Sequence, residues 1–157
     1  MVEFKKNNIF CENVEAIVNP VNCVGVMGKG LALQFKKFYP ENFTQYQDLC
    51  KSGTLKPGVL FVYETNLQKN PKFIINFPTK KHWKEKSDLE DIKLGLIALC
   101  QVIDDRGIKS IAIPPLGCGL GGLEWFEVKQ HIQKIVGIYF RGKDIRIVLL
   151  EPSEVIC

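Results

Sequence analysis

Two glycine clusters are the residues of this sequence best suited to binding an anion. The first is GVMGKG, residues 25–30, and the second is GCGLGG, residues 117–122. Each follows a β-rich run and precedes a helix-like run, so backbone N–H groups there are free to face an anion. No acidic residue occurs from Asn19 to Gln34, and no charge of either sign occurs from Ser110 to Leu123. Together the two clusters predict a clamp for a diphosphate.

Either glycine cluster taken alone is also compatible with an ordinary tight turn. The first lacks the spacing GxxxxGK[ST] of a Walker phosphate loop. The second does match GxGxxG, but no acidic residue follows a second strand at the expected distance. A nicotinamide-dependent dehydrogenase is therefore disfavoured, and the diphosphate clamp is the stronger interpretation of the pair.

A basic stretch lies between the two glycine clusters. Residues 69–86 hold six lysines and a single acid, Glu85. Lys80 follows the apolar run KFIINF, residues 72–77, which predicts a position at the carboxyl end of a strand, where ligands bind in parallel sheets. A lysine there can stabilise a leaving group as a cation, or condense with a sugar aldehyde if its pKa is lowered. The plain alternative is a solvated surface lysine.

The elements that must position these residues alternate between strand-like and helix-like runs. Apolar residues at helical spacing from Leu89 to Ile103 predict a helix that ends at Gly107, and Ser87 with Glu90 forms a capping box at its start. Strands that alternate with helices predict an α/β fold, with a mostly parallel sheet covered on both faces. We expect strands at 2–4, 15–21, 58–64, 72–77, 110–114 and 144–150, and helices within 31–50, interrupted at Pro40, at 87–104 and at 125–139.

Composition limits the class of protein. The chain has 157 residues, 46% of them hydrophobic and 24% charged, which fits one domain spanning residues 1–157. The net charge is +4, but only three of the 21 basic residues are Arg, which disfavours a surface that reads base edges. No run resembles a signal peptide or a membrane span, so we expect a cytoplasmic protein that binds no membrane. Six cysteines without a CxxC pair, and two histidines, predict inert thiols and neither a metal nor a cofactor.

Three linked motifs carry a family resemblance that spans essentially the whole chain. They are VNPVNCVGVMGKGLALQFK (residues 18–36), NFPTKKHW (76–83) and PPLGCGLGGLEW (114–125). In this order they resemble the macrodomain family of ADP-ribose binders. Within it they are similar to a branch with the terminal ADP-ribose protein glycohydrolases and, closer still, the DarG-type DNA ADP-ribosyl glycohydrolases. The resemblance implies a macrodomain-like three-layer α/β/α sandwich around a mixed, mostly parallel sheet.

DarG-type proteins are antitoxins that remove ADP-ribose from thymidine in DNA, and the resemblance implies the same reaction here. It assigns catalysis to Lys80 and Asn22, and it places Asn8 and Glu151 near adenine. The protein-directed relatives carry an Asp where this chain has Gly121, which leaves the general base unassigned. The residues expected to contact ADP-ribose are Asn8, Ile9, Asn19, Asn22, Val24, Gly25, Val26, Met27, Gly28, Lys29, Gly30, Thr79, Leu116, Gly117, Cys118, Gly119, Leu120, Gly121, Gly122 and Glu151.

The rest of the basic stretch offers an edge for single-stranded DNA. Lysines can follow the phosphates, and an aromatic ring can stack on a base. The alternatives are a solubilising face for the lysines and half-buried packing for the tryptophan. The residues concerned are Lys81, His82, Trp83, Lys84 and Lys86.

The partners expected from the resemblance are ADP-ribose, ADP-ribosylated single-stranded DNA and a cognate DNA ADP-ribosyltransferase toxin, with the chain itself a monomer. Two other functions stay open. The chain can be an ADP-ribose-binding module without turnover, because no carboxylate is well placed for catalysis. It can also be a macrodomain hydrolase that acts on ADP-ribosylated protein or on ADP-ribose 1″-phosphate.

Overall fold

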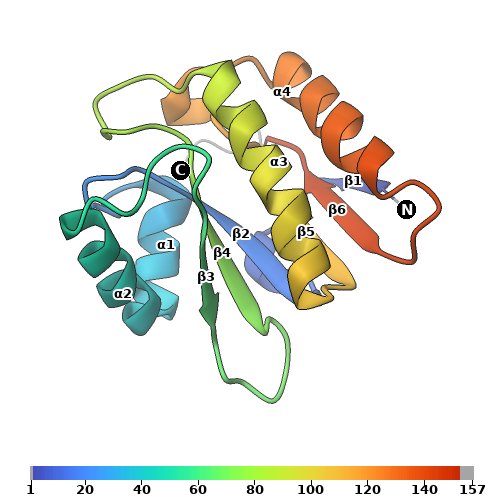
Figure 1. Ribbon diagram of the computed structural model, residues 1–157, viewed down its shortest axis with the longest axis horizontal. Coiled ribbons are helices and arrows are strands. Elements are labelled where there is room, and N and C mark those ends of the chain that lie inside the picture. Colours follow the sequence, from blue (N-terminus) through green and yellow to red (C-terminus); the bar gives the residue numbers. More distant parts are fainter. Residues whose placement is uncertain (1, 153–157) are drawn as a thin grey trace.

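The computed structural model describes residues 2–152 and shows a six-stranded sheet between two layers of helices (Figure 1). The sheet order is β1-β6-β5-β2-β4-β3, and neighbouring strands are parallel except for β3 and β4, which are antiparallel. The expected three-layer sandwich around a mixed, mostly parallel sheet is confirmed. The elements are β1 (Val2–Lys5), the 3-10 turn η1 (Ile9–Cys11), β2 (Ala16–Val21), α1 (Gly30–Phe38), α2 (Pro40–Lys51), β3 (Phe61–Glu64), β4 (Phe73–Pro78), α3 (Leu89–Arg106), β5 (Ser110–Ile113), the 3-10 turn η2 (Gly119–Gly121), α4 (Trp125–Ile132), the π-helical turn η3 (Gln133–Gly137) and β6 (Arg146–Leu150).

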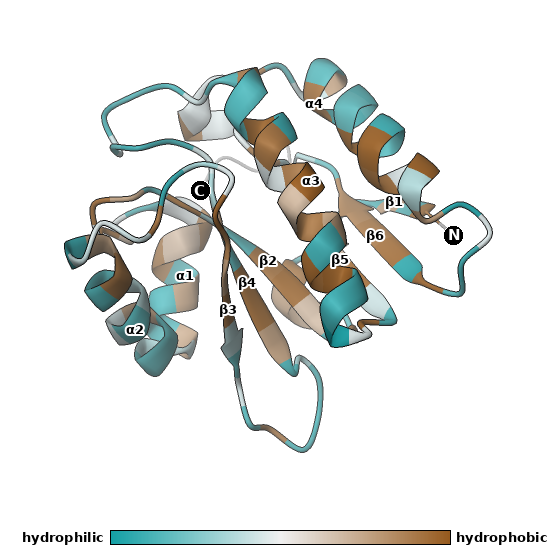
Figure 2. Cartoon of the chain, viewed as in Figure 1, coloured by the Kyte–Doolittle hydropathy of each residue, from teal (hydrophilic) through white to brown (hydrophobic). Residues whose placement is uncertain are grey.

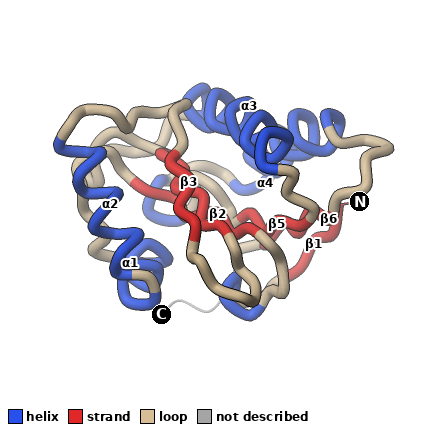
Figure 3. Tube along the Cα trace, turned by 60° about the horizontal axis from the view of Figure 1, so that its bottom comes forward, coloured by secondary structure: helices blue, strands red, loops and turns tan. Residues whose placement is uncertain are grey.

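Different helices cover the two faces of the sheet, and Figure 3 shows the strands between them. On one face, α3 and α4 pack over a large apolar cluster that includes Ile75 and Leu96. On the other face, α1 packs over a second cluster that includes Ile17 and Phe35. The inner strands β6, β5, β2 and β4 are hydrophobic along most of their length (Figure 2), because a parallel sheet with helices on both faces is buried on both.

The start of α3 differs from the prediction. Asp88, not Ser87, caps the helix, because its side chain accepts a hydrogen bond from Glu90 N at 2.9 Å. Asp and Ser are about equally good N-caps, so the sequence Ser-Asp-Leu-Glu is compatible with either frame. Ser87 is instead buried against the second glycine cluster. The predicted end of the helix is confirmed, with Gly107 in the left-handed conformation at φ +62°.

The other predicted elements are confirmed, with some shifts at their ends. The break at Pro40 separates α1 from α2 as expected, and the proline occupies the first turn of α2. β3 begins at Phe61 rather than at residue 58, because Gly58 has φ +90° and Val59 N closes a turn onto Lys56 O. Within residues 2–152, no helix is long and apolar enough to cross a membrane.

Candidate functional site

The carboxyl ends of the five parallel strands meet along one edge of the sheet, and the loops that follow them carry the predicted site. In sheet order these loops follow β1, β6, β5, β2 and β4. They bring Asn8, Glu151, the second glycine loop (residues 116–122), the first glycine loop (residues 22–30) and Lys80 into one row. Neighbouring strands lie about 4.8 Å apart, so the five ends span roughly 19 Å. An elongated ligand laid along this edge would meet all five loops.

The first glycine loop is closed by the side chain of Asn22. Its Nδ2 donates to Val26 O at 2.7 Å, and its Oδ1 accepts from Val24 N at 3.1 Å and Val26 N at 3.4 Å. The Tyr46 hydroxyl, on α2, lies 2.7 Å from that Oδ1 and 2.9 Å from the Asn22 carbonyl oxygen. One amide group therefore fixes the turn from residue 22 to residue 26, and α2 holds the amide in place.

Tyr46 belongs to a polar connection between α2, the sheet and the loop. The residue is fully buried, and burial raises the pKa of its hydroxyl well above the usual range, so the hydroxyl keeps its proton and donates to Asn22. One helical turn earlier, Asn42 exchanges hydrogen bonds with Asn76 of β4 at 2.7 and 3.2 Å. Residues four apart share a face of a helix. The same face of α2 is therefore tied to both β4 and the first glycine loop.

The N-terminus of α1 opens onto the first glycine loop without a side-chain cap. Lys29 occupies the N-cap position in an extended conformation, and among the described residues no side-chain capping hydrogen bond is made to the first turn. First-turn N–H groups carry partial positive charge and attract anions. Val24 and Val26, on the same loop, are 45% and 40% exposed. The loop therefore offers amide donors together with apolar surface.

The second glycine loop is shaped by backbone hydrogen bonds and by the lack of side chains. Leu123 N donates to Gly117 O at 2.9 Å, and Gly117 has φ +74°, a conformation that favours glycine. A Cβ on Gly117 would lie 2.7 Å from Leu123 Cδ1, and one on Gly121 would lie 2.6 Å from Ser87 Oγ. Within residues 2–152, Gly119 N donates to no acceptor. The loop therefore brings bare backbone to the surface, as an anion site requires.

Lys80 lies directly beyond β4, beside the first glycine loop. Thr79 N donates to Val21 O and Cys23 N donates to Lys81 O, both at 2.9 Å, so the pairing of β2 with β4 continues past the ends of both strands. Lys80 is half-buried, and its carbonyl oxygen lies 3.6 Å from Cys23 Sγ. The structure thus places Lys80 at the ligand end of a parallel strand. Its catalytic role stays a prediction.

The basic edge (residues 81–86) runs over the surface from β4 to α3 (Figure 1). Lys81, Lys84 and Lys86 are exposed, and Trp83 is 49% exposed. The ring centroids of His82 and Trp83 are 5.1 Å apart, and Lys84 Nζ lies 5.2 Å from the Trp83 centroid. An aromatic ring with half of its surface free and a cation beside it is suited to stacking on a base.

The predicted adenine contacts lie at the far end of the row, after β1 and β6. Asn8 is exposed and caps η1, where its Oδ1 accepts from Phe10 N at 3.0 Å. Ile9 is buried. Glu151 is half-buried, and its N–H donates to Lys5 O at 2.9 Å, which extends the pairing of β1 with β6. The Asn8 oxygen already has one donor, and its second lone pair can accept another hydrogen bond. Its contact with adenine stays a prediction.

Three predicted contacts have almost no exposed surface, and two residues that hold the loops were missed. Asn19, Met27 and Leu116 are at most 1% exposed, so they support the loops rather than offer surface to a ligand. The Asn19 amide donates to a side chain of β4 at 3.1 Å. The residues missed are Tyr46 and Ser87. Apolar spacing around Tyr46 signals its burial, but nothing in the sequence signals its partner.

The thiols within the two glycine loops are protonated at neutral pH. Burial raises the pKa of Cys23, in the first loop, to about 11, and that of Cys118, in the second loop, to about 11 as well. A thiol in this state is a weak nucleophile, because the thiolate is the reactive form. The structure therefore supports the expectation that these cysteines are inert.

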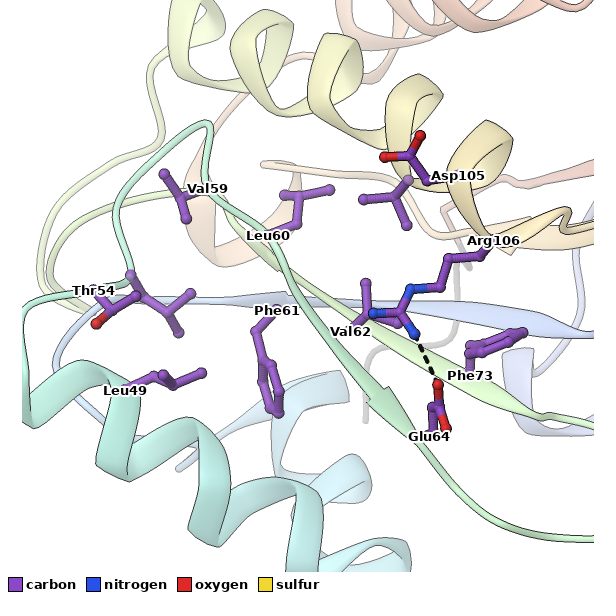
Figure 4. Close-up of a pocket in the computed structure, with 12 residues that line it drawn as sticks. Leu49, Thr54, Val59, Leu60, Phe61, Val62, Glu64, Phe73, Asp105 and Arg106 are labelled. Atoms are coloured by element: carbon purple, nitrogen blue, oxygen red, sulfur yellow. Dashed lines mark hydrogen bonds and ion pairs between the residues drawn. The ribbon is translucent and has the colours of Figure 1, made fainter.

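A hollow of about 650 Å³ lies elsewhere, along the edge strand β3 (Figure 4). Its wall is mostly apolar and includes Phe61 and Val62, and it contains an ion pair between Arg106 and Glu64, 2.9 Å apart. None of the residues that line it is a predicted site residue. The amide groups and the lysine that suit an anionic ligand gather at the carboxyl edge instead, away from this hollow.

The fold and the two glycine loops at its carboxyl edge define a class of protein. The family model for the macro domain matches residues 18–132, and the chain belongs to this family. The family expected from the sequence motifs is confirmed.

Similar proteins place the chain within the family. A Mycobacterium tuberculosis protein named DNA ADP-ribosyl glycohydrolase is 48% identical over 153 residues, which are 98% of this chain and 43% of that protein. The solved macrodomain of Mycobacterium tuberculosis DarG is 48% identical, with a TM-score of 0.92 over 98% of this chain and 99% of that one. The structure of Thermosipho africanus DarTG in complex with ADP-ribose is 34% identical, with a TM-score of 0.85 over 96% of this chain and 41% of that one. The DarG-type resemblance is confirmed, and the chain spans less than half of the curated relative.

Proposed function

We propose that the chain binds ADP-ribose and hydrolyses the N-glycosidic bond that joins it to thymidine in DNA. The observation that carries the proposal is the order of the loops along the carboxyl edge, from the predicted adenine contacts through both glycine loops to Lys80. That order matches the order of groups in ADP-ribose, which runs from adenine through the diphosphate to the distal ribose. Relatives with 48% identity are named for this activity, and a solved relative contains ADP-ribose.

In this arrangement the diphosphate lies between the two glycine loops. The uncapped N-terminus of α1 and the bare backbone around Gly119 supply neutral N–H donors, and no acid in either loop repels the phosphates. The distal ribose then lies next to Asn22 and Lys80, which β2 and β4 bring side by side. Asn22 orients the sugar through the loop that it closes, because its own oxygen already accepts from Val24, Val26 and Tyr46.

The reaction breaks the bond between C1″ of the distal ribose and a nitrogen of the base, and it forms a bond from C1″ to a water oxygen. The base leaves with the electron pair and takes up a proton, while the sugar passes through an oxocarbenium-like state. The Lys80 ammonium can stabilise the departing base and give it that proton. In a second route the neutral Lys80 amine attacks C1″, and the base leaves with the electron pair of the broken bond and one amine proton. The ring then opens as its oxygen leaves C1″ with the other amine proton, which gives a Schiff base, and water adds to C1″ and releases the amine.

The basic edge supplies the contact with the DNA strand. It adjoins Lys80 along the chain, and its lysines are exposed with Trp83 among them. Phosphates pair with lysines, and a base stacks on the half-exposed indole, without readout of sequence. We further propose that residues 1–157 form one macrodomain that acts as a cytoplasmic monomer, with a DNA ADP-ribosyltransferase toxin as its cognate partner.

The proposal is tested by turnover of ADP-ribosylated DNA by the unmodified protein and by Lys80→Ala. We expect Lys80→Ala to abolish hydrolysis while the Kd for ADP-ribose stays within about threefold, because the clamp consists mostly of backbone groups. Lys72→Ala is the matched control, since Lys72 is exposed and precedes β4 at its opposite end. Binding without turnover by the unmodified protein would establish the binding module instead.

The substrate is tested by offering ADP-ribosylated DNA, ADP-ribosylated protein and ADP-ribose 1″-phosphate side by side. Turnover confined to DNA supports the proposal, and equal turnover of protein conjugates contradicts it. Changing Lys81, Lys84 and Lys86 to Glu should weaken DNA binding and flatten its salt dependence. The control changes Lys56, Lys69 and Lys72, three exposed lysines outside the site, to Glu. An unchanged salt slope in the first variant would show that its lysines only solubilise the surface.

A further inference from the structure

The bridge segment (residues 79–87) connects the two glycine loops and is fastened at both ends. At its start, Thr79 N donates to Val21 O and Lys81 O accepts from Cys23 N, both at 2.9 Å, which fixes it to β2 and the first loop. At its end, Ser87 N donates to Gly121 O at 2.9 Å. Lys80 lies within this segment, so its position depends on both attachments.

The attachment to the second loop is a close contact between Ser87 and Gly121. A Cβ on Gly121 would lie 2.6 Å from Ser87 Oγ and 3.2 Å from Ser87 Cβ. Ser87 Cβ is also 3.2 Å from the position of a Cβ on Gly117, and Lys86 Cδ is 3.3 Å from that of a Cβ on Gly122. Three glycines of the second loop therefore lie against the last two residues of the bridge segment. Gly121 has an ordinary φ, so only this contact demands a glycine there.

The hydroxyl group of Ser87 does not stabilise this contact through a hydrogen bond. Ser87 is 7% exposed, and within residues 2–152 its buried Oγ has no hydrogen-bond partner. A buried hydroxyl without a partner costs free energy. The capping role that the sequence predicts for this serine belongs to Asp88. What Ser87 does provide is a small side chain and a backbone N–H in contact with the loop predicted to hold the diphosphate.

We propose that Ser87 and Gly121 are positioning residues for the reaction. Their contact sets the distance between the second glycine loop and the bridge segment, so a diphosphate bound in that loop places the distal ribose at a fixed offset from Lys80. The inference rests on the proposed function. It goes beyond that function because it links the diphosphate loop to the reacting amine through the contact of Gly121, in that loop, with Ser87, at the end of the bridge segment that carries Lys80.

The test adds the missing Cβ and then makes room for it. Gly121→Ala should lower kcat, measured at saturating substrate so that any change in Kd does not enter, by about 100-fold, since a displacement of about 1 Å from reacting geometry costs that much. Combining it with Ser87→Gly should return kcat to within about threefold of Ser87→Gly alone, because the colliding atoms are gone. Gly137→Ala is the control, since a Cβ there would meet only Val2 Cγ2 at 3.9 Å.

A second readout does not depend on turnover. In hydrogen–deuterium exchange, ADP-ribose should protect the amides of residues 81–87 in the unmodified protein, lose that effect in Gly121→Ala and regain it in the double variant. If the unmodified protein shows this protection but no hydrolysis, the proposed function fails, while the proposed link between the second glycine loop and the bridge segment stands. Unchanged kcat in Gly121→Ala, a loss that Ser87→Gly does not restore, or a loss accounted for by Kd alone would each overturn the inference.

Discussion

The two glycine loops share one proposed task, binding the diphosphate, and are held in shape by opposite means. In the first loop, the side chains of Asn22 and Tyr46 make the fixing hydrogen bonds. In the second loop, backbone groups bond to one another, and Gly117 and Gly121 pack so closely that a Cβ would collide with a neighbour. The first loop is held by hydrogen bonds from polar side chains. The second loop is held by backbone hydrogen bonds and by close packing around glycines, which leaves no room for a side chain.

The difference shows where each loop is vulnerable. The hydroxyl that fixes the first loop comes from α2, so a substitution outside the loop can open it. Within residues 2–152, no side chain from a neighbouring helix fixes the second loop in a comparable way. It is instead disturbed by added atoms, because its glycines are closely packed. Removing a hydroxyl that holds the first loop and adding a methyl group to the second loop should therefore have different effects on the free energy of unfolding and on ligand affinity.

The largest effect is expected for Gly117→Ala. The variant puts an L-residue at φ +74° and a Cβ at 2.7 Å from Leu123 Cδ1. Backbone strain and overpacking together should lower the free energy of unfolding by about 3 kcal/mol. Gly142→Ala is the control, because Gly142 has φ +75° and no atom within 4 Å of its ideal Cβ.

Urea unfolding of both variants measures the steric part of this effect. Gly142→Ala should lose only the backbone part, about 1 kcal/mol. Equal losses would mean that the loop yields to the new methyl group, and the second loop would then not be held by close packing.

A smaller effect is expected for Tyr46→Phe. The change removes only the hydroxyl that lies 2.7 and 2.9 Å from the two oxygens of Asn22. We expect a loss of about 1–2 kcal/mol in unfolding free energy and about a tenfold weaker Kd for ADP-ribose, because the first loop loses its tie to α2. Calorimetric titration with ADP-ribose measures the second quantity.

Tyr63→Phe is the matched control for this variant. Its hydroxyl is also in a partly buried hydrogen bond, to Glu41 Oε2 at 3.1 Å, but it belongs to β3, away from both loops. ADP-ribose affinity should stay unchanged in Tyr63→Phe. A comparable loss of affinity in the two variants would remove the special role of Tyr46.

The sequence predicted where the two glycine loops lie, but it did not predict which residues elsewhere in the chain hold them in shape. Glycine clusters that follow β-rich runs locate both loops, and the lysine that follows KFIINF after two further residues locates the ligand end of β4. These signals can be read from the sequence because each involves residues that are close together along the chain. The bond between Tyr46 and Asn22 joins residues 24 apart in the sequence. Such a pairing depends on how α2 packs against the loop, which no local pattern encodes.

Ser87 is a second residue whose role could not be predicted from its neighbours in the sequence. Its local pattern is a valid capping box, but Asp88 one residue later satisfies the helix end equally well. Ser87 instead lies against Gly121, which is 34 residues away along the chain. Tertiary packing therefore places a predicted helix cap against the second glycine loop.

The smallest difference between the loops is expected in their thiols. Burial raises the pKa of both Cys23 and Cys118 to about 11, although one loop is latched and the other close-packed. Alkylation by iodoacetamide at pH 8 should therefore be about two orders of magnitude slower than for a free thiol, and should rise about tenfold per pH unit toward pH 11. Mass spectrometry of each peptide measures both rates in one sample, with the exposed Cys11 as internal reference. Fast labelling of Cys23 alone would show that the first loop opens in solution, since opening would remove the burial that raises the pKa of its thiol. The hydrogen bonds of Tyr46 to Asn22 would then hold the loop less firmly than their lengths imply.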